Sequence, residues 1–318
     1  MFRWIRPLAF LVAALPACGS RYDCSLLATP GASPVLVKEL QVPDSARNFA
    51  VRVRAFIPEP VNAETRLIVL SPGLDADLAD ADPVARTLAA SNYAVAVVEH
   101  RASTSARVCA GGQKGADCWR ALEESETHAE NWDDRFSDIL LLMDELPAQV
   151  GVDAAHIGLV GHSFGAFTTM AFGGTTYVDP RTQERRDRRD ARVVSVVAMS
   201  PQGPRWFGLD DQSWDHIDRP LFLMTGDHDG TTMIDDSPEW RRVPFAHMRG
   251  GDKLMLRIED GNHMSFTARE KHRGISELVQ RAALAFIDGT MRKGDTGASL
   301  TAEAVKTCSH GHASLERR

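Results

Sequence analysis

The stretch that decides the fold is Ile157-Gly158-Leu159-Val160-Gly161-His162-Ser163-Phe164-Gly165-Ala166. It begins with apolar residues typical of a buried strand and continues into a run that favours a helix as far as Phe172. Glycines stand two residues before and two residues after the serine. This pattern predicts a sharp turn between strand and helix, in which the serine takes a strained conformation and only glycines leave room for it. We expect the turn to aim Ser163 Oγ outward, above the free N–H groups of the helix.

On both sides of this turn, runs rich in β-formers alternate with helical runs. The first two expected strands form a hairpin-like pair at Val35–Val42 and Phe49–Ile57. Further apolar strands are expected at Arg66–Leu70, Tyr93–Val98, Val193–Met199, Pro220–Thr225 and Lys253–Ile258. Helices are expected at Asp82–Ser91, Asp133–Leu146, Ser237–His247 and Ile275–Met291. Strands that are apolar on both faces and separated by helices indicate a mostly parallel central sheet with helices on both faces.

The same pattern predicts one α/β domain over residues 25–290, with an insertion at about 101–131 and a polar C-terminal tail over 291–318. The chain has 318 residues, of which 43% are hydrophobic, and this is enough apolar material for one large core. Lys and Arg number 36 against 43 Asp and Glu, so the basic surface of a nucleic-acid-binding protein is absent. No repeat with a period of 20 to 50 residues is visible in the sequence, which excludes solenoids and propellers.

The N-terminus predicts export. Arg3 and Arg6 precede an uncharged apolar stretch over residues 7–17, which is too short to cross a bilayer and typical of a secretory signal. Residues 1–17 are therefore expected to form a signal peptide. Leu15-Pro16-Ala17-Cys18 resembles a bacterial lipobox, so we expect Cys18 to be lipidated and to attach the protein to a membrane. Such a protein would be a periplasmic, outer-membrane or cell-surface lipoprotein; an ordinary cleaved signal, which would give a secreted protein, is the alternative.

The other four cysteines form an even set, as expected in an oxidising compartment, and three pairings are open to them. Cys109 and Cys118 flank a glycine-containing loop that can fold back on itself. Their pairing would leave Cys24 to join Cys308. Free buried thiols are the alternative.

A serine at such a turn needs a base, and in this architecture an acid and then a histidine follow it along the chain. His263 lies directly after the last predicted strand, in contrast to His272, His310 and His312. Two acids, Asp227 and Asp229, follow the strand Pro220–Thr225. Asp229 is favoured because it stands three residues after Gly226, while Asp227 still lies at the edge of the strand. The loop after the preceding strand, Met199-Ser200-Pro201-Gln202, offers no acid.

Two backbone N–H groups are expected to face an oxyanion beside the serine. One belongs to Phe164, which follows the serine, and the other to Leu74 in the loop Ser71-Pro72-Gly73-Leu74-Asp75. Trp206 and Phe207 are candidate substrate-binding residues, although either could equally belong to the core, and the insertion is a further candidate. The charged run Arg181–Arg192 is interpreted as a solvated surface loop, and Cys308-Ser309-His310-Gly311-His312 as a disulfide-bearing tail with no metal.

Four of these motifs together resemble the α/β-hydrolase superfamily: Ser71-Pro72-Gly73, Gly161-His162-Ser163-Phe164-Gly165, Thr225-Gly226-Asp227-His228-Asp229 and Gly261-Asn262-His263-Met264-Ser265-Phe266. More narrowly, they resemble the bacterial predicted dienelactone hydrolases, the platelet-activating-factor acetylhydrolases and the polyester hydrolases. The chain differs from true dienelactone hydrolases, which carry a cysteine nucleophile. It also differs from the platelet-activating-factor enzymes, whose acid follows the earlier strand, where this chain has Ser200.

The resemblance implies an α/β-hydrolase fold and acyl transfer to water from a small-molecule or polymeric ester, with small or medium acyl groups and without a metal or cofactor. Ser163 would be the nucleophile, His263 the base and Asp229 the group that orients it. A serine peptidase or amidase on the same fold is the alternative, since it uses the same residues. The propeller that the larger oligopeptidases of this fold carry before the hydrolase domain is absent from the sequence.

Overall fold

The structure is a computed structural model that describes residues 22–230, 237–294 and 300–318. The predicted signal peptide, residues 1–17, and the predicted lipidation site, Cys18, lie outside the described residues. No helix in the described ranges is both long enough and apolar enough to span a bilayer.

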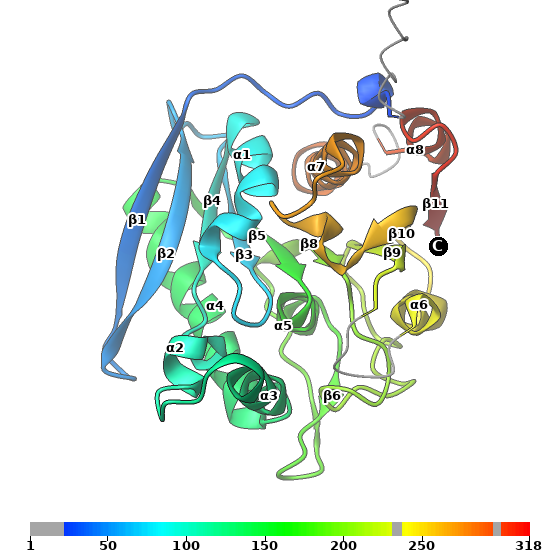
Figure 1. The fold of residues 1–318 in the computed structure, drawn as a ribbon. Coiled ribbons are helices and arrows are strands. Elements are labelled where there is room, and N and C mark those ends of the chain that lie inside the picture. Colours follow the sequence, from blue (N-terminus) through cyan, green and yellow to red (C-terminus); the bar gives the residue numbers. More distant parts are fainter. Residues whose placement is uncertain (1–21, 231–236, 295–299) are drawn as a thin grey trace, which may run out of the picture.

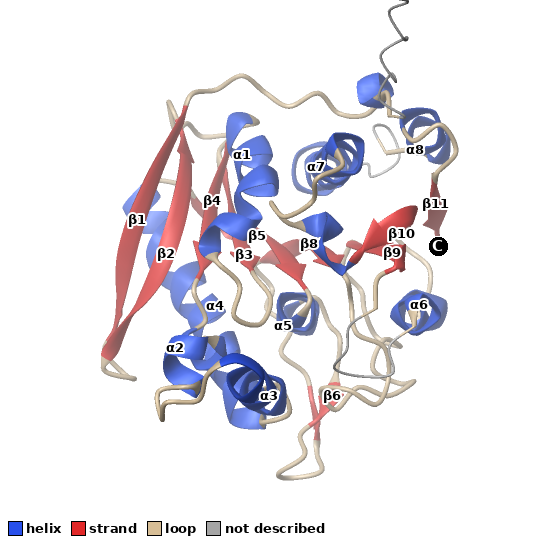
Figure 2. Cartoon of the chain, viewed as in Figure 1, coloured by secondary structure: helices blue, strands red, loops and turns tan. Residues whose placement is uncertain are grey.

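A nine-stranded sheet forms the centre of the described chain, in the order β1-β2-β4-β3-β5-β8-β9-β10-β11 (Figures 1 and 2). The strands are β1 (Val35–Asp44), β2 (Phe49–Pro58), β3 (Arg66–Ser71), β4 (Tyr93–Val98), β5 (Asp153–His162), β8 (Val193–Met199), β9 (Leu221–His228), β10 (Lys253–Asn262) and β11 (Ala313–Arg317). From β4 through β10 every neighbouring pair is parallel, whereas β1, β2 and β11 pair antiparallel at the two edges. The predicted mostly parallel sheet is confirmed.

Helices cover both faces of this sheet, with α1 and α7 on one side and α4, α5 and α6 on the other (Figure 1). The helices are α1 (Asp82–Ala90), α2 (Ser105–Val108), α3 (Gly115–Ser125), α4 (Ala129–Val150), α5 (Phe164–Phe172), α6 (Pro238–His247), α7 (Arg273–Asp288) and α8 (Ala302–Cys308). Alternate residues of the inner strands pack against the helices on opposite faces of the sheet. In β3, Ile68 and Leu70 face the α1–α7 side, while Leu67 and Val69 face the α4–α5 side. This is why these strands are apolar throughout.

The two segments expected to lie outside this regular pattern contain helices and strands within their described residues. The insertion at about 101–131 contains α2 and α3, and it also includes the first turn of α4. In the expected tail, residues 300–318 are part of the fold, because α8 packs beside α7 and β11 adds an edge strand to β10. Its polar composition is explained by its place at the edge: β11 buries Ala313, while three of its five side chains are exposed.

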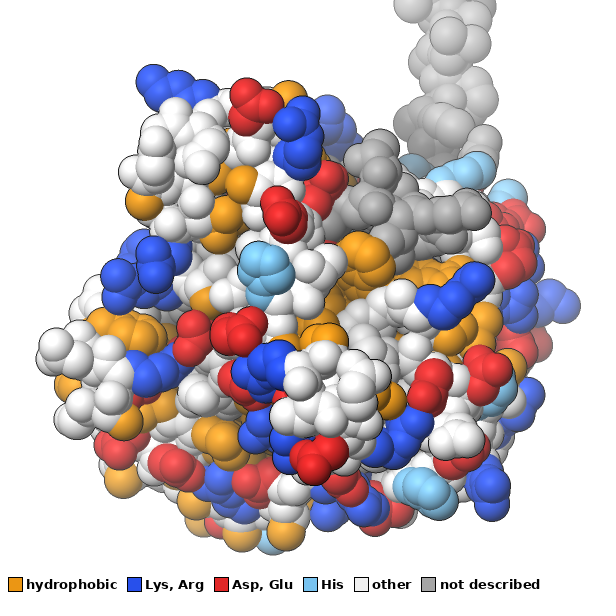
Figure 3. All heavy atoms as spheres, turned by 90° about the horizontal axis from the view of Figure 1, so that it is seen from below, with side chains coloured by type: hydrophobic (Ala, Val, Ile, Leu, Met, Phe, Trp, Pro, Cys, Tyr) orange, Lys and Arg blue, Asp and Glu red, His pale blue; other side chains and the backbone are white. Residues whose placement is uncertain are grey.

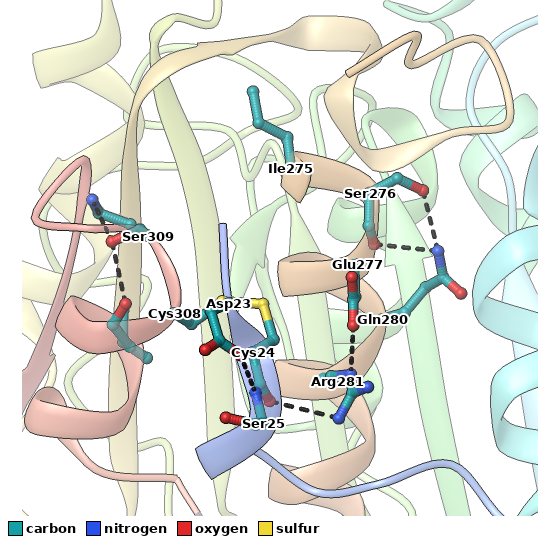
Figure 4. The surroundings of a disulfide bond; sticks show 12 residues. Asp23, Cys24, Ser25, Ile275, Ser276, Glu277, Gln280, Arg281, Cys308 and Ser309 are labelled. Atoms are coloured by element: carbon teal, nitrogen blue, oxygen red, sulfur yellow. Dashed lines mark hydrogen bonds and ion pairs between the residues drawn. A yellow bond between two sulfur atoms is a disulfide. The ribbon is translucent and has the colours of Figure 1, made fainter. Parts of the chain in front are cut away.

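Both expected disulfides are present, Cys109–Cys118 within the insertion and Cys24–Cys308 between the chain's N-terminal segment and α8. Figure 4 shows the second one against α7, where Arg281 donates to the carbonyl of Cys24 and pairs with Glu277. The N–H of Asp23 also donates to the carbonyl of Cys308, at 2.7 Å. The first described residues are therefore bound to the last helix.

The charged run Arg181–Arg192 contains β7 (Arg185–Arg186), which pairs antiparallel with β6 (Tyr177–Val178) just before the run. Its arginines pair with nearby acids: Arg181 with Asp179, Arg192 with Asp190, and Arg188 with Asp133 of α4. Figure 3 shows this side of the molecule, where positive and negative side chains are interleaved. Most of these arginines are partly exposed, as expected for a solvated surface loop, and ion pairs of this kind contribute only about 0–1 kcal/mol each.

Candidate active site

Ser163 lies at the turn between β5 and α5 in the strained backbone conformation that the sequence predicts, with φ 55° and ψ −123°. The glycines around it have no room for a side chain. A Cβ on Gly165 would collide with the carbonyl of Ser71, and a Cβ on Gly161 would collide with the carbonyl of Gly165. The backbone N–H of Ser163 donates to Met199 O at 2.9 Å, which ties the turn to the neighbouring strand β8.

His263 begins the short 3₁₀ helix His263–Phe266 directly after β10, and a capping box between Asn262 and Ser265 holds the start of this helix. Its Nε2 lies 3.0 Å from Ser163 Oγ, and its Nδ1 lies 2.9 Å from Asp229 Oδ1. With an ionised carboxylate at Nδ1, that nitrogen carries the proton, so Nε2 has a free lone pair that can accept the proton of the Ser163 hydroxyl. Of the other candidates, His272 caps α7 and His312 pairs with Glu259.

Asp229 follows β9 and its side chain is fully buried. Its Oδ2 accepts hydrogen bonds from Ser200 Oγ at 2.8 Å and from Thr225 Oγ1 at 2.9 Å, and Arg241 Nε lies 3.1 Å from Oδ1. Burial acts to raise the pKa of Asp229, but Arg241, His263 and Ser200 together hold it below its ordinary value. The carboxylate is therefore ionised at neutral pH. The roles of Ser200, Thr225 and Arg241 could not be predicted from the sequence, because they depend on contacts between segments far apart in the chain.

Asp227, the alternative acid, has another partner. Its Oδ2 accepts from Arg257 Nη2 of β10 at 2.7 Å, and both side chains are partly exposed. Asp229, and not Asp227, is therefore the acid that contacts His263 in the structure.

The loop after β3 also lies close to Ser163. A Cβ on Gly73 would lie 3.2 Å from Ser163 Cβ. Within the described residues, neither the N–H of Leu74 nor that of Phe164 is donated to a backbone carbonyl. The next residue, Asp75, has φ 47°, and its carboxylate accepts from Ser105 N at 2.6 Å. The insertion therefore holds the loop that carries Leu74.

His162 packs against His263, with 4.9 Å between their ring centroids. Its Nε2–H donates to the carbonyl of His263 at 2.8 Å. Burial, followed by the nearby imidazole of His263, lowers the pKa of His162 to about 3, so this ring is neutral at physiological pH. It braces the backbone of His263 without adding a charge to the site.

A cavity of about 420 Å³ opens beside Ser163 and His263. Its apolar wall comes from β3, α1, β8, the 3₁₀ helix and the insertion, through Leu70, Val84, Met199, Met264, Phe266 and Trp119. Trp119 of α3 is 44% exposed and follows Cys118 of the short disulfide. At the rim, Arg269 is paired with Asp80 at 2.8 Å.

The two candidate substrate-binding residues, Trp206 and Phe207, do not line this cavity. Phe207 is buried in the core, where its ring stacks on Phe164 with centroids 4.7 Å apart, and Trp206 packs edge-on against Phe207. They lie behind the serine turn because apolar aromatics after a central strand fill the layer between sheet and helix. The tryptophan that reaches the cavity is Trp119, from the insertion.

No family model matches the sequence, and no curated protein matches it. Among solved structures, the chain resembles a ferulic acid esterase from Streptomyces cinnamoneus with a TM-score of 0.63. The match covers 92% of this chain and 99% of that protein, at 17% sequence identity. The chain has the α/β-hydrolase fold. At this identity the likeness establishes the fold, and the narrower groups named from the sequence motifs stay predictions.

Proposed function

We propose that this protein is a serine carboxylic ester hydrolase that acts through an acyl-enzyme. The observation that carries the proposal is the hydrogen-bonded row Ser163–His263–Asp229 at the floor of an apolar cavity. The structural neighbour is named as an esterase, which supports the same general reaction here. The row requires only protein groups for the reaction, so the proposed mechanism uses no metal or cofactor.

In this mechanism, Ser163 Oγ attacks the ester carbonyl while its proton passes to His263 Nε2. The imidazolium is stabilised by Asp229 and then gives the proton to the leaving alkoxide, which departs as an alcohol. A water molecule next attacks the acyl-serine, again losing its proton to His263, and the acid is released as Ser163 regains its hydrogen. The N–H groups of Phe164 and Leu74 are proposed to bind the oxyanion in both steps.

The cavity favours a neutral acyl or alkyl group. Its volume of about 420 Å³ lies within the range of small-molecule sites, and most of its wall is apolar. Arg269, the one Lys or Arg among the described residues of the wall, is already paired with Asp80. An anionic substrate would therefore find no free guanidinium or ammonium there. We propose esters with small or medium acyl groups, held against Trp119.

We also propose that the protein acts outside the cytoplasm. Its two disulfides are stable in an oxidising compartment, and this agrees with the signal peptide expected over residues 1–17. Lipidation of Cys18 would attach the folded domain to a membrane through the short segment before Cys24, which the second disulfide binds to α8.

The deciding experiment compares p-nitrophenyl acetate and butyrate with aminoacyl p-nitroanilides. We expect hydrolysis of the esters only, and we expect Ser163→Ala to lower kcat by about 10⁴-fold or more with an unchanged circular dichroism spectrum. Ester hydrolysis by Ser163→Ala within tenfold of wild type would refute the nucleophile. Hydrolysis of the anilides at comparable rates would favour the peptidase or amidase.

A further inference from the structure

A buried arginine lies behind the proposed oxyanion site and contacts both of its halves. Arg135 of α4 is fully buried. Its Nη2 donates to the carbonyl of Pro72 at 2.5 Å and to Ser71 Oγ at 3.1 Å. These two residues begin the loop that carries Leu74, so one edge of the guanidinium holds this loop through a backbone carbonyl and a side-chain hydroxyl.

The same guanidinium also reaches Phe164. Its carbon lies 4.2 Å from the centroid of the Phe164 ring, and its Nε donates to Thr168 Oγ1 at 2.9 Å. Thr168 in turn donates to the carbonyl of Phe164 at 3.0 Å. Arg135 therefore connects the first turn of α5, which carries one proposed oxyanion donor, to the loop that carries the other.

A second row of serine, histidine and aspartate holds this arginine in place. Ser71 Oγ lies 2.8 Å from His100 Nε2, and His100 Nδ1 lies 2.8 Å from Asp138 Oδ2. Because the Asp138 carboxylate accepts a hydrogen bond from Nδ1–H, Nε2 carries no proton and accepts a hydrogen bond from the Ser71 hydroxyl, which leaves a lone pair of Ser71 Oγ for Arg135. Burial and the nearby guanidiniums lower the pKa of His100 well below its ordinary value, so the ring is neutral.

This second row has the residue types of the first, but its position gives it a different role. Ser71 is fully buried and does not line the cavity, so no substrate can reach its hydroxyl. The outer end of the row is an ion pair between Asp138 and Arg47, on the far side of His100 from the cavity. What the row can do is fix the orientation of a hydroxyl that faces Arg135.

Burying the guanidinium of Arg135 costs free energy, which indicates that this residue has a specific role. Within the described residues its Nη1 has no hydrogen-bond partner, although it is buried. Buried donors are nearly always paired in folded proteins, and a well-packed apolar side chain often fills such a space at lower cost. An arginine is useful here because its planar fork can donate to groups on β3 and α5 at fixed angles.

We propose that Arg135 is a positioning residue that sets the spacing between the N–H groups of Phe164 and Leu74. This inference rests on the proposed ester hydrolase function. Loss of one oxyanion donor typically costs on the order of 100-fold or more in kcat, so a displaced donor should cost about tenfold. The loss should fall on kcat, because these donors act on the charge that develops in the transition state.

The test uses two neighbouring threonines of α5. Thr168 and Thr169 are both fully buried, and each donates its hydroxyl to the carbonyl four residues earlier, but only Thr168 accepts from Arg135. We expect Thr168→Val to lower kcat for p-nitrophenyl butyrate about tenfold with KM within twofold of wild type. Thr169→Val is the matched control and should stay within twofold in kcat.

Ser71→Ala tests the other arm, with Ser195→Ala as its control, since Ser195 is an equally buried serine of a central strand that bonds Thr290. We expect Ser71→Ala to lower kcat about tenfold and to weaken inhibition by phenylboronic acid, which forms a tetrahedral adduct with a serine, by a similar factor. Arg135→Met should lower kcat further, and Arg135→Lys should lie between Arg135→Met and wild type.

If Arg135→Met fails to fold, the threonine and serine pairs decide. Test variants that match their controls in kcat would overturn the positioning role while leaving the proposed function intact. Variants in which KM rises and kcat is unchanged would also overturn it. A wild-type protein that hydrolyses no ester would refute the proposed function and this inference together.

Discussion

Replacing Asp229 by asparagine keeps the shape of the side chain and removes its charge. The present carboxylate accepts from His263 on one oxygen and from Ser200 and Thr225 on the other. An asparagine has one oxygen and one NH₂ group for these two sides. If its NH₂ faces His263, then Nδ1 must accept, Nε2 carries the proton, and the ring can no longer take the proton of Ser163.

If the asparagine turns the other way, the correct tautomer is kept, but the imidazolium formed during the reaction has lost its counter-charge. The first orientation costs on the order of 10⁴-fold in kcat, the loss known for the same change in chymotrypsin-like proteases, and the second costs less. We therefore expect Asp229→Asn to lower kcat between about 10²-fold and 10⁴-fold, measured with p-nitrophenyl butyrate.

Asp227→Asn is the matched control, because Asp227 lies two residues before Asp229, at the end of β9. Asp227 pairs with Arg257, whose side chain is 42% exposed, and such pairs contribute only about 0–1 kcal/mol to stability. We expect its kcat to stay within threefold of wild type and its Tm to change little. A loss of less than tenfold in Asp229→Asn, or a larger loss in Asp227→Asn, would refute the assignment of the acid.

Three further outcomes are expected. First, kcat/KM should fall at acid pH, because a protonated imidazole at His263 cannot accept the proton of Ser163, and the loss should follow one group, since His162 is already neutral above about pH 3; a flat profile from pH 5 to 8 would contradict this. Second, Trp119→Ala should raise KM for p-nitrophenyl octanoate several-fold and leave KM for p-nitrophenyl acetate unchanged. Leu26→Ala is the control, because Leu26 is the other exposed large apolar side chain among the described residues, and it should change neither KM. Third, mass spectrometry of the non-reduced mature protein should find two disulfides, no free thiol and a diacylglyceryl group on Cys18; a mature chain beginning elsewhere would remove the lipid anchor from the proposal.

The sequence is sufficient to predict a local structure where only one kind of residue fits the backbone or the environment. Glycines around Ser163 are required by the carbonyls of Ser71 and Gly165, so the turn could be predicted from their spacing. The central strands could be predicted because both of their faces are buried. The choice of Asp229 over Asp227 rested on its offset from Gly226, and the structure places Asp229 beside His263.

Other features could not be predicted because they depend on contacts between distant segments. Trp206 and Phe207 were candidates for the cavity, yet the stacking of Phe207 on Phe164 places both behind the serine turn. Trp119 belongs to α3, within a segment that the sequence marks only as an insertion, and the path of the insertion brings it to the cavity. The strand Ala313–Arg317 was hidden because an edge strand exposes most of its side chains.

The two buried arginines show why the sequence pattern of a site does not reveal what holds it. Loops that follow parallel strands turn their carbonyl groups inward at the edge of the sheet, and each buried carbonyl needs a donor. Arg241 of α6 donates to the carbonyls of Ser200, Pro201 and Asp229, and Arg135 of α4 donates to that of Pro72. In a helix, either arginine would ordinarily be assigned to the solvent-facing side. Both instead donate to the loops that carry Asp229 and Leu74. These loops are therefore fixed by helices that lie on the same face of the sheet as α5, and Ser163 lies between the two loops.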